Sequence, residues 1–130
     1  MRHLPKTAIA LSLFLCVGCK QEKAAPSDFE GTWVEERTLS DTLVVNSEVS
    51  LITLNRGTEM TADGYLLPKH GSGAYIYQLN DNRIRLNFAL SSCMCPKEYS
   101  FNVENNRLVI GNFYSHAGRP EPVLTFRKIR

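Results

Sequence analysis

A repeated pattern of paired strands is the feature that most limits how this chain can fold. The segment Tyr77–Phe88 matches the segment Phe101–Ile110, and each copy carries an Asn-Arg pair at the same place. Asn and Asp tolerate the positive φ that a tight hairpin turn requires, and apolar residues alternate with polar ones on both sides of the turn. Each copy therefore predicts a β-hairpin, and the two copies in tandem predict a four-stranded meander.

The rest of the chain after residue 28 shows the same kind of pattern. Short alternating runs are separated by Gly, Asn, Asp and Pro, and no window carries the spacing of an amphipathic helix. The predicted strands are Gly31–Thr38, Glu48–Leu54, a weaker pair at Thr58–Met60 and Tyr65–Leu67, Ala74–Leu79, Arg83–Leu90, Lys97–Val103, Leu108–Phe113 and Val123–Ile129. In a chain of 130 residues this pattern predicts an all-β fold, a single antiparallel up-and-down β-barrel of about eight strands.

The two ends of this region carry a more specific resemblance. Gly31-Thr32-Trp33 lies on the first predicted strand, and Leu124–Ile129 lies on the last. These ends resemble the lipocalin-like (calycin) barrels, in which Gly-x-Trp closes the barrel floor and an Arg from the last strand packs over the Trp. The resemblance spans about Phe29 to Ile129 and implies structural roles for Gly31, Trp33 and Arg127. A lone Trp in a small barrel is also expected on size alone to be the largest core side chain.

The N-terminal segment predicts an export signal. A basic leader precedes the apolar run Ala8–Val17, which is too short to span a membrane and is typical of a signal peptide. The run ends in Cys16-Val17-Gly18-Cys19, which resembles the bacterial lipobox, where a small residue precedes the cysteine that is lipidated and becomes the mature N-terminus. The resemblance implies a signal peptide over residues 1–18, lipid attachment at Cys19, a tether over residues 19–27 and a barrel domain over residues 28–130. The alternative is an ordinary secretory signal with an incidental cysteine.

This interpretation changes the charge of the mature chain. Arg2 and Lys6 belong to the leader, so the formal net charge of +2 falls to zero when residues 1–18 are removed. A neutral domain with scattered Lys and Arg offers no electrostatic footprint for nucleic acid, so nucleic acid is not expected as a partner. Lys20 stands where enterobacterial lipoproteins carry Asp for inner-membrane retention. The resemblance therefore implies lipid anchoring on the periplasmic side of the outer membrane.

The sequence carries no catalytic motif that we recognise. It lacks a Gly-x-Ser-x-Gly elbow, a His-Glu-x-x-His pair and a phosphate-binding loop. Glu35 and Glu36 are adjacent on a predicted strand and therefore face opposite sides, which does not suit a paired carboxylate site. We therefore predict a protein that is not an enzyme and that needs no cofactor.

Cys93 and Cys95 lie between the two repeated hairpins and allow three interpretations. A local disulfide is the default in an oxidising compartment, although it needs a tight turn and would be easily reduced. Free or intermolecular thiols are the second interpretation. The third is a Cu(I) site in which Met94, His70 or His116 joins the two cysteines, because Cu(I) prefers thiolate and thioether ligands.

Aromatic residues on the predicted strands suggest a pocket. Tyr75 and Tyr77 share one face of a strand, and the neighbouring strands contribute Phe88, Tyr99, Phe101 and Phe113. We expect Tyr75, Tyr77, Phe88 and Phe101 either to line an apolar pocket for a small ligand or to fill the core, because eight-stranded barrels do both.

A loop before these strands suggests a different kind of partner. Gly71-Ser-Gly-Ala-Tyr75 resembles a loop of the periplasmic c-type lysozyme inhibitors, which are also small lipid-anchored barrels. That resemblance implies an inhibitor-type protein as an alternative function. Separately, a filled barrel interior would leave the loops around His70 and His116 as the surface that binds an envelope protein. The sequence thus predicts a binding protein whose partner is a small apolar ligand or an envelope protein. The alternatives are the inhibitor-type protein and a Cu(I)- or redox-sensing lipoprotein that uses Cys93 and Cys95.

Overall fold

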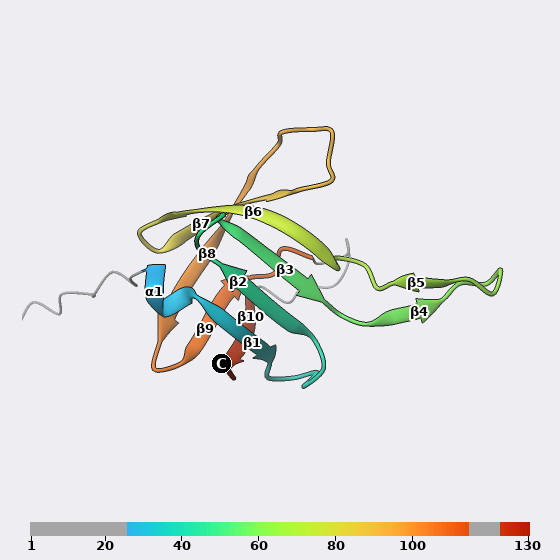
Figure 1. Ribbon diagram of the computed structural model, residues 1–130, viewed down its shortest axis with the longest axis horizontal. Helices are drawn as coiled ribbons and strands as arrows, with labels where there is room; N and C mark the ends of the chain where they lie inside the picture. The colour runs from blue at the N-terminus through green and yellow to red at the C-terminus, as the bar shows by residue number, and fades with distance from the viewer. Residues whose placement is uncertain (1–25, 115–122) are drawn as a thin grey trace, which may run out of the picture.

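Eight antiparallel strands form a closed barrel in the computed structural model, which describes residues 26–114 and 123–130 (Figure 1). Around the barrel the strands follow the order β1-β10-β9-β8-β7-β6-β3-β2, so the last strand closes on the first. The predicted all-β, up-and-down barrel is therefore confirmed. The elements are α1 (Pro26–Phe29), β1 (Gly31–Glu35), β2 (Thr42–Asn46), β3 (Leu51–Asn55), β4 (Thr58–Met60), β5 (Leu66–Pro68), β6 (Gly73–Asn80), β7 (Arg83–Phe88), β8 (Lys97–Glu104), β9 (Arg107–Gly111) and β10 (Val123–Lys128).

The four-stranded meander predicted from the repeat is confirmed. β6 pairs with β7, β7 with β8 and β8 with β9, all antiparallel. Asp81 in the first turn, and Asn105 and Asn106 in the second, adopt positive φ, which these residue types tolerate. Leu90, predicted as part of the second strand of this meander, lies beyond the end of β7 and is 84% exposed. The alternation of buried side chains therefore stops at the barrel mouth.

The first part of the barrel differs from the prediction. The strand predicted at Gly31–Thr38 ends at Glu35, and the prediction omitted Thr42–Asn46, which forms β2. Leu39, with a φ of 56°, lies in the turn between the two strands. The sequence of β2 does not alternate between apolar and polar residues, so it was not predicted as a strand. Val44 is apolar but exposed between two buried apolar residues, so apolar residues occupy both faces of the strand.

β4 and β5 form a separate two-stranded sheet that projects from the barrel as an arm (Figure 1). The weaker pair of strands predicted here is confirmed, but neither strand joins the barrel, because β3 pairs directly with β6. Met60, Tyr65, Leu66 and Leu67 on the arm are exposed. The arm is therefore an insertion between two neighbouring barrel strands.

One end of the barrel is closed by aromatic packing. The Phe29 ring at the end of α1 is fully buried, and its centroid lies 5.3 Å from that of Tyr77 and 4.9 Å from that of Phe101, edge to face. Trp33 is also fully buried, and its Nε1 donates a hydrogen bond to the Phe29 carbonyl oxygen over 3.0 Å. Trp33 therefore joins α1 to the core beneath it.

The cation over Trp33 is Lys128, and not Arg127 as the family resemblance implied. Lys128 pairs with Trp33 in the register of β1 and β10, and its Nζ lies 5.4 Å from the indole ring. Arg127 is exposed, because the alternation of β10 turns it to the other face. Gly31 has a φ of 119°, and a Cβ there would collide with the carbonyl oxygen of Arg130, so this position requires glycine.

The core that the structure describes is built from residues after position 28. All of its residues lie between Phe29 and Phe126. A chain that starts at residue 20 therefore keeps every core residue that the structure describes, and it lacks Cys16 and Cys19, which leaves Cys93 and Cys95 as its cysteines.

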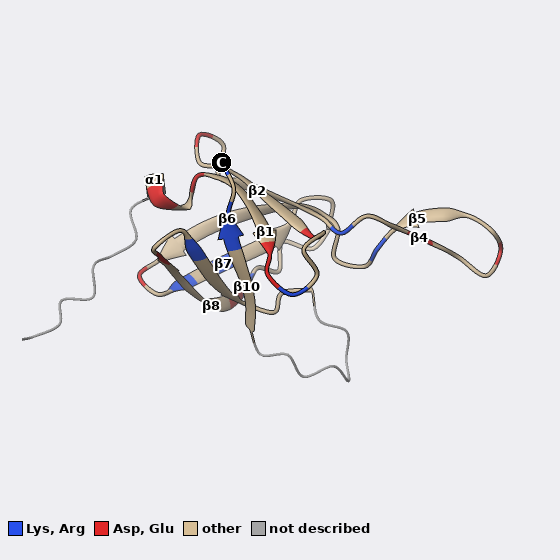
Figure 2. Ribbon diagram, turned by 90° about the horizontal axis from the view of Figure 1, so that it is seen from below, with Lys and Arg blue, Asp and Glu red and all other residues tan. Residues whose placement is uncertain are grey.

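Acidic and basic residues are interspersed along the strands and loops (Figure 2). Exposed ion pairs join Arg107 to Glu36 at 3.4 Å and Arg83 to Glu98 at 4.0 Å. Pairs of this kind contribute about 0–1 kcal/mol each, so the surface charges do little to hold the barrel together.

Candidate functional site

A pocket of about 350 Å³ lies at the end of the barrel opposite α1. Its aromatic wall comes from β6, β7, β8 and the residues after β9, and consists of Tyr75, Phe88, Tyr99, Phe113 and Tyr114. The polar residues around it include His70, Ser91, Asn87 and Lys97. The pocket therefore combines an apolar wall with a few polar groups, which is the usual composition of a small-molecule site.

The structure separates the four aromatic residues that were predicted to line a pocket. Tyr75 and Phe88 do line it. Tyr77 and Phe101 do not, because both pack against Phe29 in the closed half of the barrel. The barrel interior is thus filled at one end and open at the other. The expectation of a filled core holds for the end near α1, and the expectation of a pocket holds for the opposite end.

Phe113 holds the aromatic wall together. Its ring centroid lies 5.1 Å from that of Tyr75, 6.2 Å from that of Tyr99 and 5.2 Å from that of Tyr114. Tyr114 was missed by the sequence analysis. Its position directly after Phe113, at the end of a predicted strand, is the sequence signal that could have found it.

The glycine-rich loop before β6 packs against this wall. The Tyr75 hydroxyl donates a hydrogen bond to the Gly71 carbonyl oxygen over 2.6 Å. Gly71 has a φ of 84°, and a Cβ there would collide with the Cβ of Tyr114. The loop that resembles the lysozyme inhibitors therefore requires glycine for local packing at the pocket.

A buried ion pair supports the wall from behind Tyr114. Asp41 is 2% exposed, and its Oδ2 accepts a hydrogen bond from Arg56 Nε over 2.8 Å. Nη1 of Arg56 donates to the His70 carbonyl oxygen over 2.5 Å, and the guanidinium carbon lies 4.3 Å from the Tyr114 ring centroid. Arg56 therefore ties the pocket wall to the loop before β2. Sequence reasoning missed this pair, because no motif or short spacing relates the two residues.

The adjacent glutamates face opposite sides of β1 and the turn after it, as the alternation of a strand predicts. Glu35 is buried, and its carboxylate accepts a hydrogen bond from the backbone nitrogen of Thr38 over 2.6 Å. Glu36 is exposed and pairs with Arg107. The two carboxylates therefore do not form a joint site.

The pocket tyrosines keep their protons well above neutral pH. Burial raises the pKa of Tyr75 and Tyr99 above the ordinary value of 10.0. Burial also raises the pKa of Tyr114, and the nearby Asp41 carboxylate raises it further. The phenol groups therefore remain neutral, which keeps the wall free of negative charge at physiological pH.

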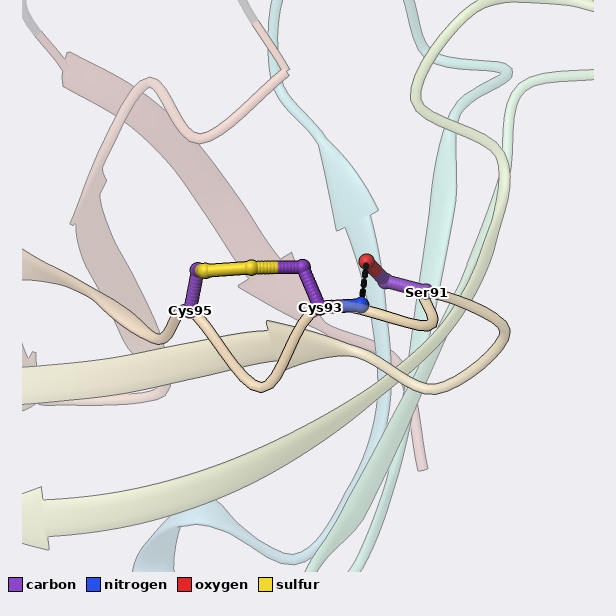
Figure 3. The surroundings of a disulfide bond; sticks show 3 residues. All are labelled: Ser91, Cys93 and Cys95. Carbon is purple, nitrogen blue, oxygen red and sulfur yellow. Dashed lines mark hydrogen bonds between the residues drawn. A yellow bond between two sulfur atoms is a disulfide. The ribbon is translucent and has the colours of Figure 1, made fainter.

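Cys93 and Cys95 form a disulfide in the loop between β7 and β8 (Figure 3). Their Cα atoms are 5.3 Å apart, and the backbone nitrogen of Cys93 donates a hydrogen bond to Ser91 Oγ over 3.2 Å. Both cysteines are exposed, and Cys95 belongs to the lining of the pocket. The structure thus gives the local disulfide, the first of the three interpretations.

The other predicted site residues find less support. Among residues 26–114 and 123–130, no group of three or more His, Cys, Asp or Glu side chains is placed to hold a metal ion, and Met94 is 89% exposed. His116, a proposed Cu(I) ligand, and Cys19 lie outside the described residues. In the same ranges, no helix is long and apolar enough to cross a membrane.

Comparison with protein-family models, with curated proteins and with solved structures gave no match.

Proposed function

We propose that this protein is a lipid-anchored, non-enzymatic binding protein of the bacterial cell envelope, and that its ligand is a small apolar molecule bound in the aromatic pocket. The observation that carries the proposal is the pocket itself, about 350 Å³ in volume and walled by five aromatic side chains. Small-molecule sites commonly measure roughly 300–1,000 Å³, with apolar walls and a few polar groups that orient the ligand. His70, Asn87 and Lys97 supply such groups.

The proposal treats the domain as lipocalin-like. Gly31 and Trp33 lie on β1, and a cation from the last strand lies over the indole ring, although it is Lys128. Eight-stranded barrels of this kind have an interior wide enough for one small ligand. Here the half of the interior near α1 is filled by Phe29, so the ligand would enter only the half lined by Tyr75 and Phe88.

The pocket can be tested with 2-naphthylmethanol as the probe and the chain from residue 20 onward. Phe88 is 36% exposed, lines the pocket and packs on Tyr75 with 5.2 Å between ring centroids, so Phe88→Ser removes wall area without opening the core. The loss of this contact is expected to weaken binding about tenfold, as measured by titration of naphthyl fluorescence.

Ile76→Ser is the matched control. Ile76 is a half-exposed apolar residue on the paired strand β6, and it does not line the pocket. Its substitution is expected to leave the affinity within about twofold of the unmodified chain, since it removes apolar surface elsewhere. Equal weakening by both substitutions would place the probe on the outer surface of the barrel and contradict the proposal.

The proposed anchor is the lipid on Cys19, with the barrel on the periplasmic side of the outer membrane. Cys19→Ala is expected to leave an uncleaved precursor with no incorporated palmitate, because the lipid forms a thioether with this thiol. Labelled palmitate in bacterial cells, followed by gel electrophoresis, measures both effects. Cys16→Ala is the matched control and should be processed like the unmodified chain. Palmitate on the Cys19→Ala chain would exclude Cys19 as the attachment site.

The alternative partner is an envelope protein bound through the loops, and the inhibitor-type function rests on the loop resemblance alone. Gly71 and Ser72 belong to the pocket lining, and Gly71 packs against Tyr114. We therefore favour the small ligand, and an inhibitor-type function stays a prediction.

A further inference from the structure

The disulfide forms part of the pocket wall. Cys95 lines the pocket together with Ser91 and Lys97, whereas Cys93 is not among the lining residues. Figure 3 shows the bridge spanning a bend of the loop between β7 and β8. A molecule bound in the pocket therefore lies beside Cys95, and Cys93 does not line the pocket.

The disulfide is expected to contribute little to the stability of the barrel. It joins residues separated by two positions, in an exposed loop outside the strands. A ring of this size restricts the unfolded chain far less than the ~15-residue loop for which about 3 kcal/mol is expected. The barrel closes through its own strand pairs, which lie outside this loop. An exposed disulfide with a small stabilising role is accessible to attack by thiols.

We propose that the Cys93–Cys95 disulfide reversibly captures a ligand that carries both a thiol and an apolar group. The inference rests on the proposed function, because it assigns a chemical class to the ligand of the same pocket. The ligand's apolar group would occupy the aromatic wall, and its thiol would lie against Cys95.

The capture step is a thiol–disulfide exchange. The ligand thiol gives its proton to solvent, and the thiolate attacks Sγ of Cys95. The bond between Cys93 and Cys95 breaks, a disulfide forms between the ligand and Cys95, and Cys93 leaves as a thiolate that takes up a proton. One disulfide replaces another, so the step needs no oxidant. Release is the reverse reaction, in which the Cys93 thiolate attacks Cys95 and expels the ligand.

The surroundings favour attack at Cys95 over attack at Cys93. Cys95 lines the pocket and Cys93 does not, so the thiol of a molecule bound there lies closer to Cys95. Lys97 also lines the pocket, and its ammonium group favours the thiolate form of the bound ligand. Binding in the pocket therefore predicts that Cys95 carries the adduct.

The test uses the chain from residue 20 onward, 2-naphthylmethanethiol as the ligand and 2-mercaptoethanol as a thiol without a ring. After incubation, iodoacetamide alkylates the freed Cys93 thiol and so prevents reclosure. Mass spectrometry with peptide mapping is expected to find the naphthyl group on Cys95 and the alkyl group on Cys93. The yield at equal concentration should exceed that of 2-mercaptoethanol about tenfold, because the pocket buries the ring. Phe88→Ser should remove most of this preference, and Ile76→Ser should keep it.

Three results would overturn the inference. They are an adduct mainly on Cys93, equal yields from the two thiols, and alkylation of both cysteines before any thiol is added. Each can occur while 2-naphthylmethanol still binds in a manner sensitive to Phe88→Ser. Failure of thiol capture is therefore distinguishable from failure of the pocket as a binding site.

Discussion

Trp33→Ala is expected to lower the free energy of unfolding by about 3–5 kcal/mol, the range for large aromatic truncations in a core. The indole is fully buried, and its Nε1 is the hydrogen-bond donor that ties α1 to the core. Its removal leaves a cavity beneath Lys128 and an unpaired carbonyl on Phe29. Urea unfolding of the chain from residue 20 onward, followed by circular dichroism, measures the change.

Trp33→Phe separates the two contributions. It keeps most of the apolar volume and loses the donor to the Phe29 carbonyl oxygen. The expected loss is about 1–3 kcal/mol, the cost of leaving a buried polar group without its partner plus the smaller ring. A loss below about 1 kcal/mol for Trp33→Ala would show that the indole is not the central core side chain of this barrel.

Arg56→Gln is expected to lower the free energy of unfolding by about 2–4 kcal/mol, because it leaves the Asp41 carboxylate buried without a cation. The side chain of Asp41 is 3% exposed and that of Arg56 is 23% exposed, so the pair is mostly shielded from water. The substitution also removes the donor to the His70 carbonyl oxygen and the cation over Tyr114.

The double variant Arg56→Gln, Asp41→Asn gives the control for this pair. It removes the unpaired charge as well as the cation, so it should be more stable than Arg56→Gln alone. Urea unfolding at neutral pH compares the three chains. A double variant less stable than Arg56→Gln would show that Asp41 contributes through other contacts and that the ion pair is not the source of the effect.

Much of the barrel could be predicted because its strands obey simple local rules. Asp81, Asn105 and Asn106 stand where the backbone takes positive φ, so the turn residues and the alternation beside them located two hairpins. β2 was not predicted because Val44, an apolar residue on the exposed face, breaks the alternation of apolar and polar residues that marks a strand. Arg127 was assigned the place of Lys128 because the phase of a strand, one residue either way, decides which side chain faces inward.

The site could be predicted only in part. The aromatic residues of the interior could be identified from the sequence, but the end of the barrel at which each one lies could not. Phe29 fills the interior next to Tyr77 and Phe101. Tyr75 and Phe88 therefore line the pocket at the open end. The contacts of Asp41 with Arg56 join distant parts of the chain, and only the closed barrel brings them together.

The arm formed by β4 and β5 has a consequence for how this protein can vary. β3 and β6 pair with each other on their own, so every hydrogen bond between barrel strands forms without the segment from Thr58 to Pro68. Insertions and deletions in that segment fall on a surface appendage whose two strands pair only with each other. Length changes that would break the ladder elsewhere are tolerable here, which makes the arm the natural place for the chain to acquire a new peptide segment without redesigning its core.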